Sequence, residues 1–154
     1  SVAGRYVGMA ETVQALVERG IPVIGHLGLT PQSVHALGGY RVQGREARSA
    51  DRLLADAKAL ETAGACAIVL ELIPAAVAAK ISKSLTIPTV GIGAGPRCDG
   101  QVLVLHDMLG LNEQFAPKFL KHYARLGESV RSAVRSFASE VREGKYPGEE
   151  HSFE

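Results

Sequence analysis

Short apolar runs alternate with amphipathic stretches along the chain. Each run contains β-branched residues, and three of the four carry a polar side chain near the downstream end. The runs span residues 21–27, 66–72, 87–93 and 101–107. Continuous apolar runs of this length are typical of parallel strands that are covered on both faces. The pattern therefore predicts four parallel strands.

Apolar positions between these runs recur every three to four residues, which predicts helices. The clearest helix is expected over residues 49–63, with an apolar face formed by Leu53, Leu54, Ala57 and Leu60. Ser49 or Asp51 is its candidate N-cap, and Gly64 should end it. Further helices are expected over residues 9–20, from Pro74 onward, over 115–126 and over 128–143. In the helix over residues 128–143, the side chains expected to face inward are those of Val130, Val134, Phe137 and Val141.

Alternating strands and helices favour an α/β fold with a parallel sheet, either open or closed as a (β/α)8 TIM barrel. A full barrel usually needs about 250 residues, whereas this chain has 154. The chain could therefore supply half of a barrel, and an open sheet of four to five strands is the alternative. Because a chain of about 150 residues can bury roughly two thirds of its surface, residues 1–154 are expected to form a single domain.

Composition narrows the classes of partner. The 17 basic and 16 acidic residues give a net charge of +1 without a charged block, so neither nucleic acid nor a membrane surface is an expected partner. No apolar run is long enough to span a bilayer, and the first residues do not resemble a signal peptide. Cys66 and Cys98 lack metal-type spacing and fit a reducing compartment. We expect a cytoplasmic protein whose partner is a small molecule or another protein.

Polar side chains at the downstream ends of the strands are the candidates for chemistry, because both architectures build their sites there. This rule selects His26 and Glu71. Glu71 lies among aliphatic residues in AIVLELIP, so burial should raise its pKa and suit it to act as a general base. The structural alternatives are that Glu71 caps a helix or pairs with an arginine, and that His26 donates to a backbone carbonyl.

Other polar residues are weaker candidates. Thr30 and Gln32 could contact a ligand or hold the turn after the first strand, and Arg41 and Arg45 could meet an acidic group or be solvated. The glycines of GIGAG, residues 91–95, lack the spacing of a dinucleotide fingerprint and are better explained by a barrel strand that leaves room for substrate. We expect structural roles for Asp99, His106 and Asp107, which lack metal-ligand spacing.

Four stretches together resemble the downstream part of the ketopantoate hydroxymethyltransferase family. They are GIPVIGHLGLTPQSVHALGGYRVQGR, AIVLELIP, IPTVGIGAGPRCDGQVLVLHDMLG and YPGEEHSF, in the family's order, and the resemblance runs from about Glu11 to Phe153. It implies a (β/α)8 barrel that assembles as a homo-oligomer, typically a decamer. It also implies transfer of a hydroxymethyl group from 5,10-methylenetetrahydrofolate to 3-methyl-2-oxobutanoate, which gives 2-dehydropantoate in pantothenate biosynthesis.

The same resemblance implies roles for individual residues. Glu71 matches the family's proton acceptor, which creates an enolate, and His26 matches a histidine that lines the keto acid pocket. Mg2+ is implied as a cofactor bound by the keto acid. The family's metal ligands lie upstream of Ser1, so no metal-binding residue is expected in this chain.

The start of the chain departs from the family pattern. The family carries a Lys-x-Glu-Gly-Gly segment just ahead of the matched region, whereas this sequence begins SVAGRYVGMAETV. We expect a fragment of a longer protein, since an isolated half-barrel would leave strand edges unpaired. The alternatives are a non-catalytic half-barrel that associates with a complete enzyme, or a related keto acid lyase or isomerase that uses the same enolate chemistry.

Overall fold

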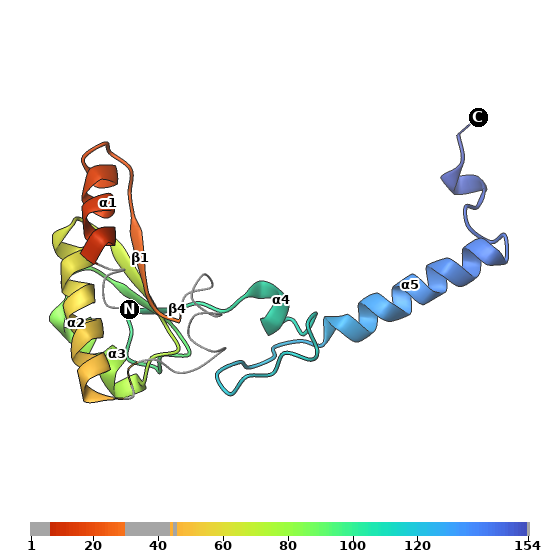
Figure 1. Ribbon diagram of the computed structural model, residues 1–154. Coiled ribbons are helices and arrows are strands. Elements are labelled where there is room, and N and C mark those ends of the chain that lie inside the picture. Colours follow the sequence, from red (N-terminus) through yellow and green to blue (C-terminus); the bar gives the residue numbers. More distant parts are fainter. Residues whose placement is uncertain (1–6, 30–43, 45, 154) are drawn as a thin grey trace. The chain divides into compact units, whose positions relative to one another are not determined.

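The computed structural model describes residues 7–29, 44 and 46–153 (Figure 1). The chain divides into two compact units, Ser1–Val102 and Leu103–Glu154. The single domain expected over residues 1–154 stays a prediction.

A four-stranded parallel sheet forms the centre of the first unit. Its strands are β1 (Ile24–Gly28), β2 (Ala67–Glu71), β3 (Thr89–Ile92) and β4 (Gly100–Gln101), and they lie in the order β1-β2-β3-β4. Every neighbouring pair is parallel. The first three predicted strands are therefore confirmed, with shorter bounds.

The fourth predicted strand, over residues 101–107, is wrong. β4 is two residues long, and residues 105–108 form the short helix α4 (Leu105–Met108). The Val102 N–H still donates to the Gly91 carbonyl at 3.0 Å, after which the chain leaves the sheet. A short apolar run without alternation fits a strand or a helix equally well, so the pattern alone did not separate the two.

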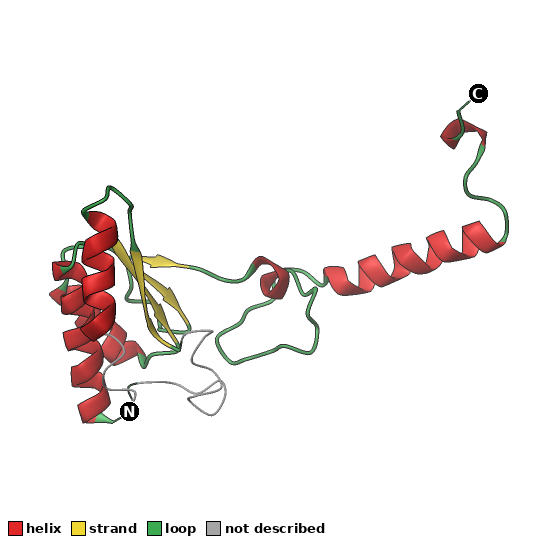
Figure 2. Ribbon diagram, turned by 45° about the horizontal axis from the view of Figure 1, so that its top comes forward, coloured by secondary structure: helices red, strands yellow, loops and turns green. Residues whose placement is uncertain are grey.

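In the described part of the first unit, three helices cover one face of this sheet (Figure 2). They are α1 (Val7–Val17), α2 (Ala47–Thr62) and α3 (Ala75–Ser84). The side chains facing them include Leu27, Ile68 and Leu70, which are completely buried. The predicted apolar face of α2 is confirmed, because Leu53, Ala57 and Leu60 are buried and Leu54 packs against the same core.

The start of α2 differs from the prediction, and its end agrees with it. Glu46 is the N-cap, and Ser49 lies within the first turn, where its hydroxyl donates to the Glu46 carbonyl at 2.8 Å. Neither Ser49 nor Asp51 is therefore the N-cap. Gly64 follows the C-cap residue Ala63 with φ +95°, a left-handed conformation that glycine adopts without steric cost.

None of the helices described in the first unit lies on the opposite face of the sheet (Figure 2). Ile24 on this face is 61% exposed, and Val69, Val90 and Ile92 are partly exposed. Strands in sequential parallel order with helices on one face are the arrangement of consecutive units in a (β/α)8 barrel, whose other face is the barrel interior. The α/β class is confirmed, and the arrangement is consistent with part of a barrel.

The second unit contains α4, a loop, the long helix α5 (Leu126–Arg142) and a 3-10 turn at Glu149–His151. The helix predicted over residues 115–126 is wrong, because this segment is a loop. Pro117 lies inside it, and proline lacks an N–H donor and disfavours the helical conformation of the preceding residue. The loop returns to α4 instead, where the Tyr123 N–H donates to the Met108 carbonyl at 2.7 Å.

Helix α5 confirms the prediction of a helix over residues 128–143, but its apolar stripe does not face inward. Val130, Val134, Phe137 and Val141 are between 46% and 60% exposed. Within the described part of the second unit, Phe137 contacts the Tyr146 ring, with 5.4 Å between the centroids. Within the described residues of the second unit, the stripe is left largely uncovered.

Candidate active site

Glu71 and His26 lie on neighbouring strands at the carboxyl edge of the sheet. Glu71 is the last residue of β2 and pairs with Gly28, the last residue of β1, while His26 pairs with Val69. Because side chains alternate between the two faces of a strand, Glu71 and His26 share the open face. Their positions are two residues apart along the strand direction, since His26 pairs with Val69. Gly28 has a φ of +95°, and a Cβ atom at this position would overlap the Glu71 carbonyl, so only glycine fits beside the Glu71 backbone.

The two side chains form a hydrogen bond. The distance between His26 Nε2 and Glu71 Oε2 is 2.9 Å, and the side chains are 35% and 18% exposed. When the carboxylate is ionised it can only accept, and the imidazole then donates through its Nε2–H. Among the described residues no hydrogen bond reaches Glu71 Oε1.

The surroundings of Glu71 differ from those that its sequence neighbours suggested. Leu70 and Ile73 are buried in the core under the helices, on the opposite face of the sheet. The residues that share the open face are Val69 and, from the paired strand, Ile92. Glu71 is therefore partly shielded by strand neighbours rather than by the residues next to it in the sequence.

Two of the three glycines of GIGAG, Gly91 and Gly95, serve close packing rather than an open substrate space. A Cβ atom on Gly91 would lie 3.0 Å from Cys98 Sγ, on the helix-covered side of β3. Gly95, with φ +80°, packs directly against Ala75 at the start of α3, where a Cβ atom would overlap. The interpretation of a strand that leaves room for substrate is therefore wrong at these two positions.

Asp99 lies at the other edge of the sheet and has a structural role. Its Oδ2 accepts from the Thr89 backbone N–H at 2.8 Å and from the Thr89 hydroxyl at 2.9 Å. These two bonds, the backbone one first, hold the pKa of Asp99 below its ordinary value. Thr89 also contacts Ser82 Oγ at 2.7 Å, so the network joins α3, β3 and the start of β4.

The remaining candidates lie elsewhere. His106 and Asp107 belong to α4 in the second unit. Thr30, Gln32, Arg41 and Arg45 lie outside the described residues. Among the residues that are described, no three His, Cys, Asp or Glu side chains gather as a metal site would require. In that same part of the chain, no helix has the length and apolar character to cross a membrane.

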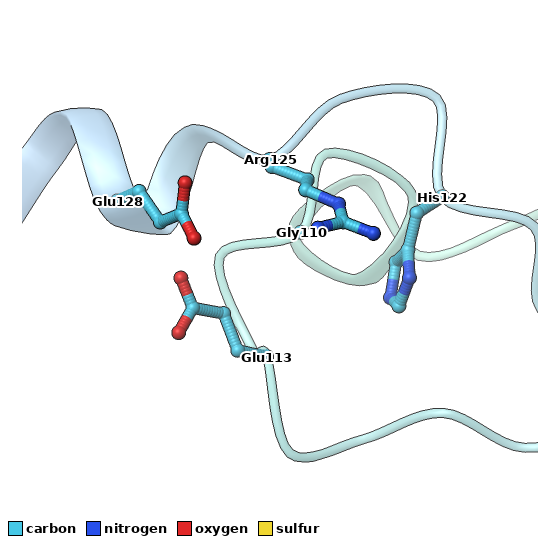
Figure 3. Close-up of a pocket in the computed structure, with 5 residues that line it drawn as sticks. All are labelled: Gly110, Glu113, His122, Arg125 and Glu128. Carbon is cyan, nitrogen blue, oxygen red and sulfur yellow. The ribbon is translucent and has the colours of Figure 1, made fainter.

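A pocket in the second unit was not anticipated from the sequence. It has a volume of about 300 Å³ and is lined by Gly110, Glu113, His122, Arg125 and Glu128 (Figure 3). Glu113 is held from outside this set, because Arg131 Nη2 donates to both of its carboxylate oxygens at 2.7 and 2.8 Å and so lowers the pKa of Glu113. The charged residues of this segment can be read from the sequence. Their meeting in one pocket could not be predicted, because a helix was wrongly expected over residues 115–126.

The fold and the paired side chains define a parallel α/β protein with a carboxylate and an imidazole at the carboxyl edge of its sheet. The sequence model of the ketopantoate hydroxymethyltransferase family matches residues 2–149. The chain belongs to the ketopantoate hydroxymethyltransferase family, which confirms the resemblance found in the sequence.

Individual relatives agree with this assignment. The 3-methyl-2-oxobutanoate hydroxymethyltransferase of Carboxydothermus hydrogenoformans is 59% identical over 145 residues, which cover 94% of this chain and 52% of the relative. The protein of the same name from Geotalea daltonii is 57% identical over 147 residues, 96% of this chain and 55% of the relative. The chain therefore spans about half the length of the curated relatives it matches.

Proposed function

We propose that this chain supplies the downstream half of a ketopantoate hydroxymethyltransferase. The reaction would transfer a hydroxymethyl group from 5,10-methylenetetrahydrofolate to 3-methyl-2-oxobutanoate and give 2-dehydropantoate. Membership in the family and the names of the relatives support this activity. The observation that carries it is the 2.9 Å contact between His26 and Glu71 on the open face of the sheet.

The chemistry of the keto acid explains why such a pair is needed. The hydrogen on C3 of 3-methyl-2-oxobutanoate lies next to a ketone, so its removal gives an enolate whose charge spreads onto the ketone oxygen. We assign the proton to Glu71 Oε1, the carboxylate oxygen without a hydrogen bond among the described residues, while His26 holds Oε2. Water hydrolyses the methylene bridge of 5,10-methylenetetrahydrofolate, which releases tetrahydrofolate and formaldehyde. The enolate carbon then attacks the formaldehyde carbon, and the alkoxide that forms takes the proton back from Glu71 to become the hydroxyl group of the product.

Mg2+ enters this proposal only through the family resemblance. When bound, it would stabilise the negative charge that develops on the ketone oxygen. The described residues do not fit a magnesium site by themselves, since no three candidate ligands lie together in them. We therefore assign no step to a metal held by this chain.

The open face of the sheet supports completion of the fold by further chain. A parallel sheet is normally covered on both faces, yet Ile24 is 61% exposed on the face that carries Glu71 and His26. We propose that the upstream half of the barrel covers this face. Assembly as a homo-oligomer and a cytoplasmic location remain part of the same proposal, and the uncovered stripe of α5 supports the former.

The proton-transfer step can be tested in a hybrid that joins this chain to the upstream half of the Carboxydothermus hydrogenoformans relative, 59% identical over the shared region. Deuterium exchange at C3 of 3-methyl-2-oxobutanoate, followed by NMR, measures the step directly. Glu71→Gln keeps the size of the side chain and removes the base. Since a general base contributes roughly 10²- to 10⁴-fold, exchange should fall by about that factor, with keto acid affinity nearly unchanged.

Glu18→Gln is the matched control, because Glu18 is an exposed glutamate of the same unit whose partner is Gln14 on the surface. The control should exchange at the parent rate. Exchange at an undiminished rate in Glu71→Gln would remove Glu71 from this role. Product analysis with and without methylenetetrahydrofolate would distinguish the transferase from a keto acid lyase or isomerase.

A further inference from the structure

Leu72, the residue directly after Glu71, has an unusual backbone conformation. Its φ of +49° lies in the left-handed region, and it is the only residue other than glycine with a positive φ in the described part of the chain. A residue with a Cβ atom adopts this conformation at a cost, and such strain persists only where the surrounding structure enforces it.

Two backbone hydrogen bonds hold the peptide that precedes the Leu72 Cα atom. The Glu71 carbonyl accepts from the Leu29 N–H at 3.0 Å, and the Leu72 N–H donates to the Ile92 carbonyl at 2.9 Å. The peptide between Glu71 and Leu72 is therefore tied to Leu29, the residue after β1, on one side and to Ile92 of β3 on the other. Gly28, with φ +95°, lies directly under this peptide, where a Cβ atom would overlap the Glu71 carbonyl.

The packing after Leu72 explains why the strain is not relieved. Ile73 is 1% exposed and packs in the core under the helices, and Pro74 is the N-cap of α3. The chain must therefore pass from the open face at Glu71 to the core at Ile73 within a single residue. A left-handed residue makes this reversal while both backbone bonds of the peptide are kept.

We propose that Leu72 is a positioning residue, which acts through its backbone conformation to direct the Glu71 carboxylate toward His26. This inference rests on the proposed role of Glu71 as the base. The direction of the Glu71 side chain depends on the backbone at Glu71, and that backbone is fixed by the reversal at Leu72. A change that disfavours the left-handed conformation should then misplace the base while the substrate pocket persists.

Substitutions at Leu72 can separate its backbone conformation from its side chain. Asparagine and glycine accept the left-handed region, whereas isoleucine has the atoms of leucine but is branched at Cβ and resists it. In the hybrid protein, Leu72→Asn and Leu72→Gly should keep kcat for C3 exchange within about threefold of the parent. Leu72→Ile should lower kcat by roughly tenfold or more with KM within about threefold, because a small misplacement of a catalytic group is costly.

A second measurement does not depend on activity. In the 154-residue chain, the side-chain ¹H–¹⁵N spectrum of His26, assigned with His26→Gln, should show a protonated Nε2 in the parent and in Leu72→Asn. In Leu72→Ile that signal should weaken or average. If Leu72→Ile does not fold, Leu72→Ala takes its place, with an effect between those of asparagine and isoleucine.

Equal kcat values for Leu72→Asn and Leu72→Ile would overturn the inference, as would a larger loss in Leu72→Asn, which would point to the side chain instead. An unchanged His26 spectrum in both variants would also overturn it. Failure of the proposed function looks different, because Glu71→Gln would then keep full exchange whatever residue 72 does.

Discussion

Helices α2 and α5 have the same kind of apolar stripe, but the stripe of α2 is buried and the stripe of α5 is exposed. In the first unit, Leu53, Ala57 and Leu60 of α2 are buried against the sheet and its neighbouring helices. In the second unit, Val130, Val134 and Phe137 of α5 are half-exposed. The stripe on each helix indicates that a covering surface is needed, but the pattern does not say whether the same unit provides it.

A similar contrast exists within the first unit, between the two faces of the sheet. Ile68 faces the helices and is completely buried, whereas Ile24 faces the open side. The covered face carries the stability of the unit, and the open face carries the candidate active site. This division is the one expected of a barrel segment, whose interior face becomes a site only when the rest of the barrel surrounds it.

The largest effect should come from matched isoleucine substitutions on the two faces. Ile68→Ala removes buried methyl groups and leaves a cavity, so it should lower the free energy of unfolding of the 154-residue chain by about 2–5 kcal/mol. Ile24→Ala should change it by less than about 0.5 kcal/mol, because Ile24 is 61% exposed. Urea unfolding followed by circular dichroism measures both values.

The Ile24→Ala substitution also tests whether an upstream half covers the open face of the sheet. In the hybrid with an upstream half, Ile24→Ala should become clearly more destabilising than in the chain alone, since the face would then be covered. An equal effect of Ile24→Ala in both contexts would count against the half-barrel.

A smaller effect is expected from the stripe of α5. Val134→Lys places a charge on the uncovered stripe, so it should shift the protein toward smaller species if α5 packs against another copy. Arg135→Lys, one residue further along the same helix, keeps the charge and should leave the mass unchanged. Size-exclusion chromatography with light scattering measures the mass, and an unaltered oligomer in Val134→Lys would exclude α5 from the subunit contact.

The smallest effect concerns pH and the network at Asp99. The Thr89 N–H and hydroxyl lower the pKa of Asp99 in the folded chain below its ordinary value of 3.8. The ionised carboxylate therefore contributes stability that is fully present above that value and is lost as the pH falls through the lowered one. The melting temperature of Asp99→Asn should lie below that of the parent at pH 7, and the difference should shrink in acid. A difference that is constant with pH would contradict this account.

Much of the first unit could be predicted from the chain, because strong local patterns coincide with tertiary packing there. Three apolar runs became β1, β2 and β3, and the periodic stretch before Gly64 became α2. The failures occurred where local signals were ambiguous or opposed. The residues after Gln101 do not continue the strand and form α4 instead. The amphipathic stretch around Pro117 forms a loop that returns to α4.

The candidate site was predicted only in part. His26 and Glu71 were selected because polar residues at strand ends face ligands in parallel α/β folds. Their contact depends on the register between β1 and β2, which places Gly28 opposite Glu71, and no local pattern encodes register. The left-handed conformation of Leu72 had no signal at all, because leucine is not a residue that favours this region.

The sequence by itself determined the parallel α/β class, the family and the two side chains that carry the proposed chemistry, since residue identity and periodicity are properties of the chain. The tertiary structure decided which carboxylate oxygen is held by His26, how Leu72 reverses the chain, and which apolar stripes are covered. The physical reason is that strand register, backbone strain and burial all arise between segments that are distant in sequence, where each segment's preference is only one of several competing terms.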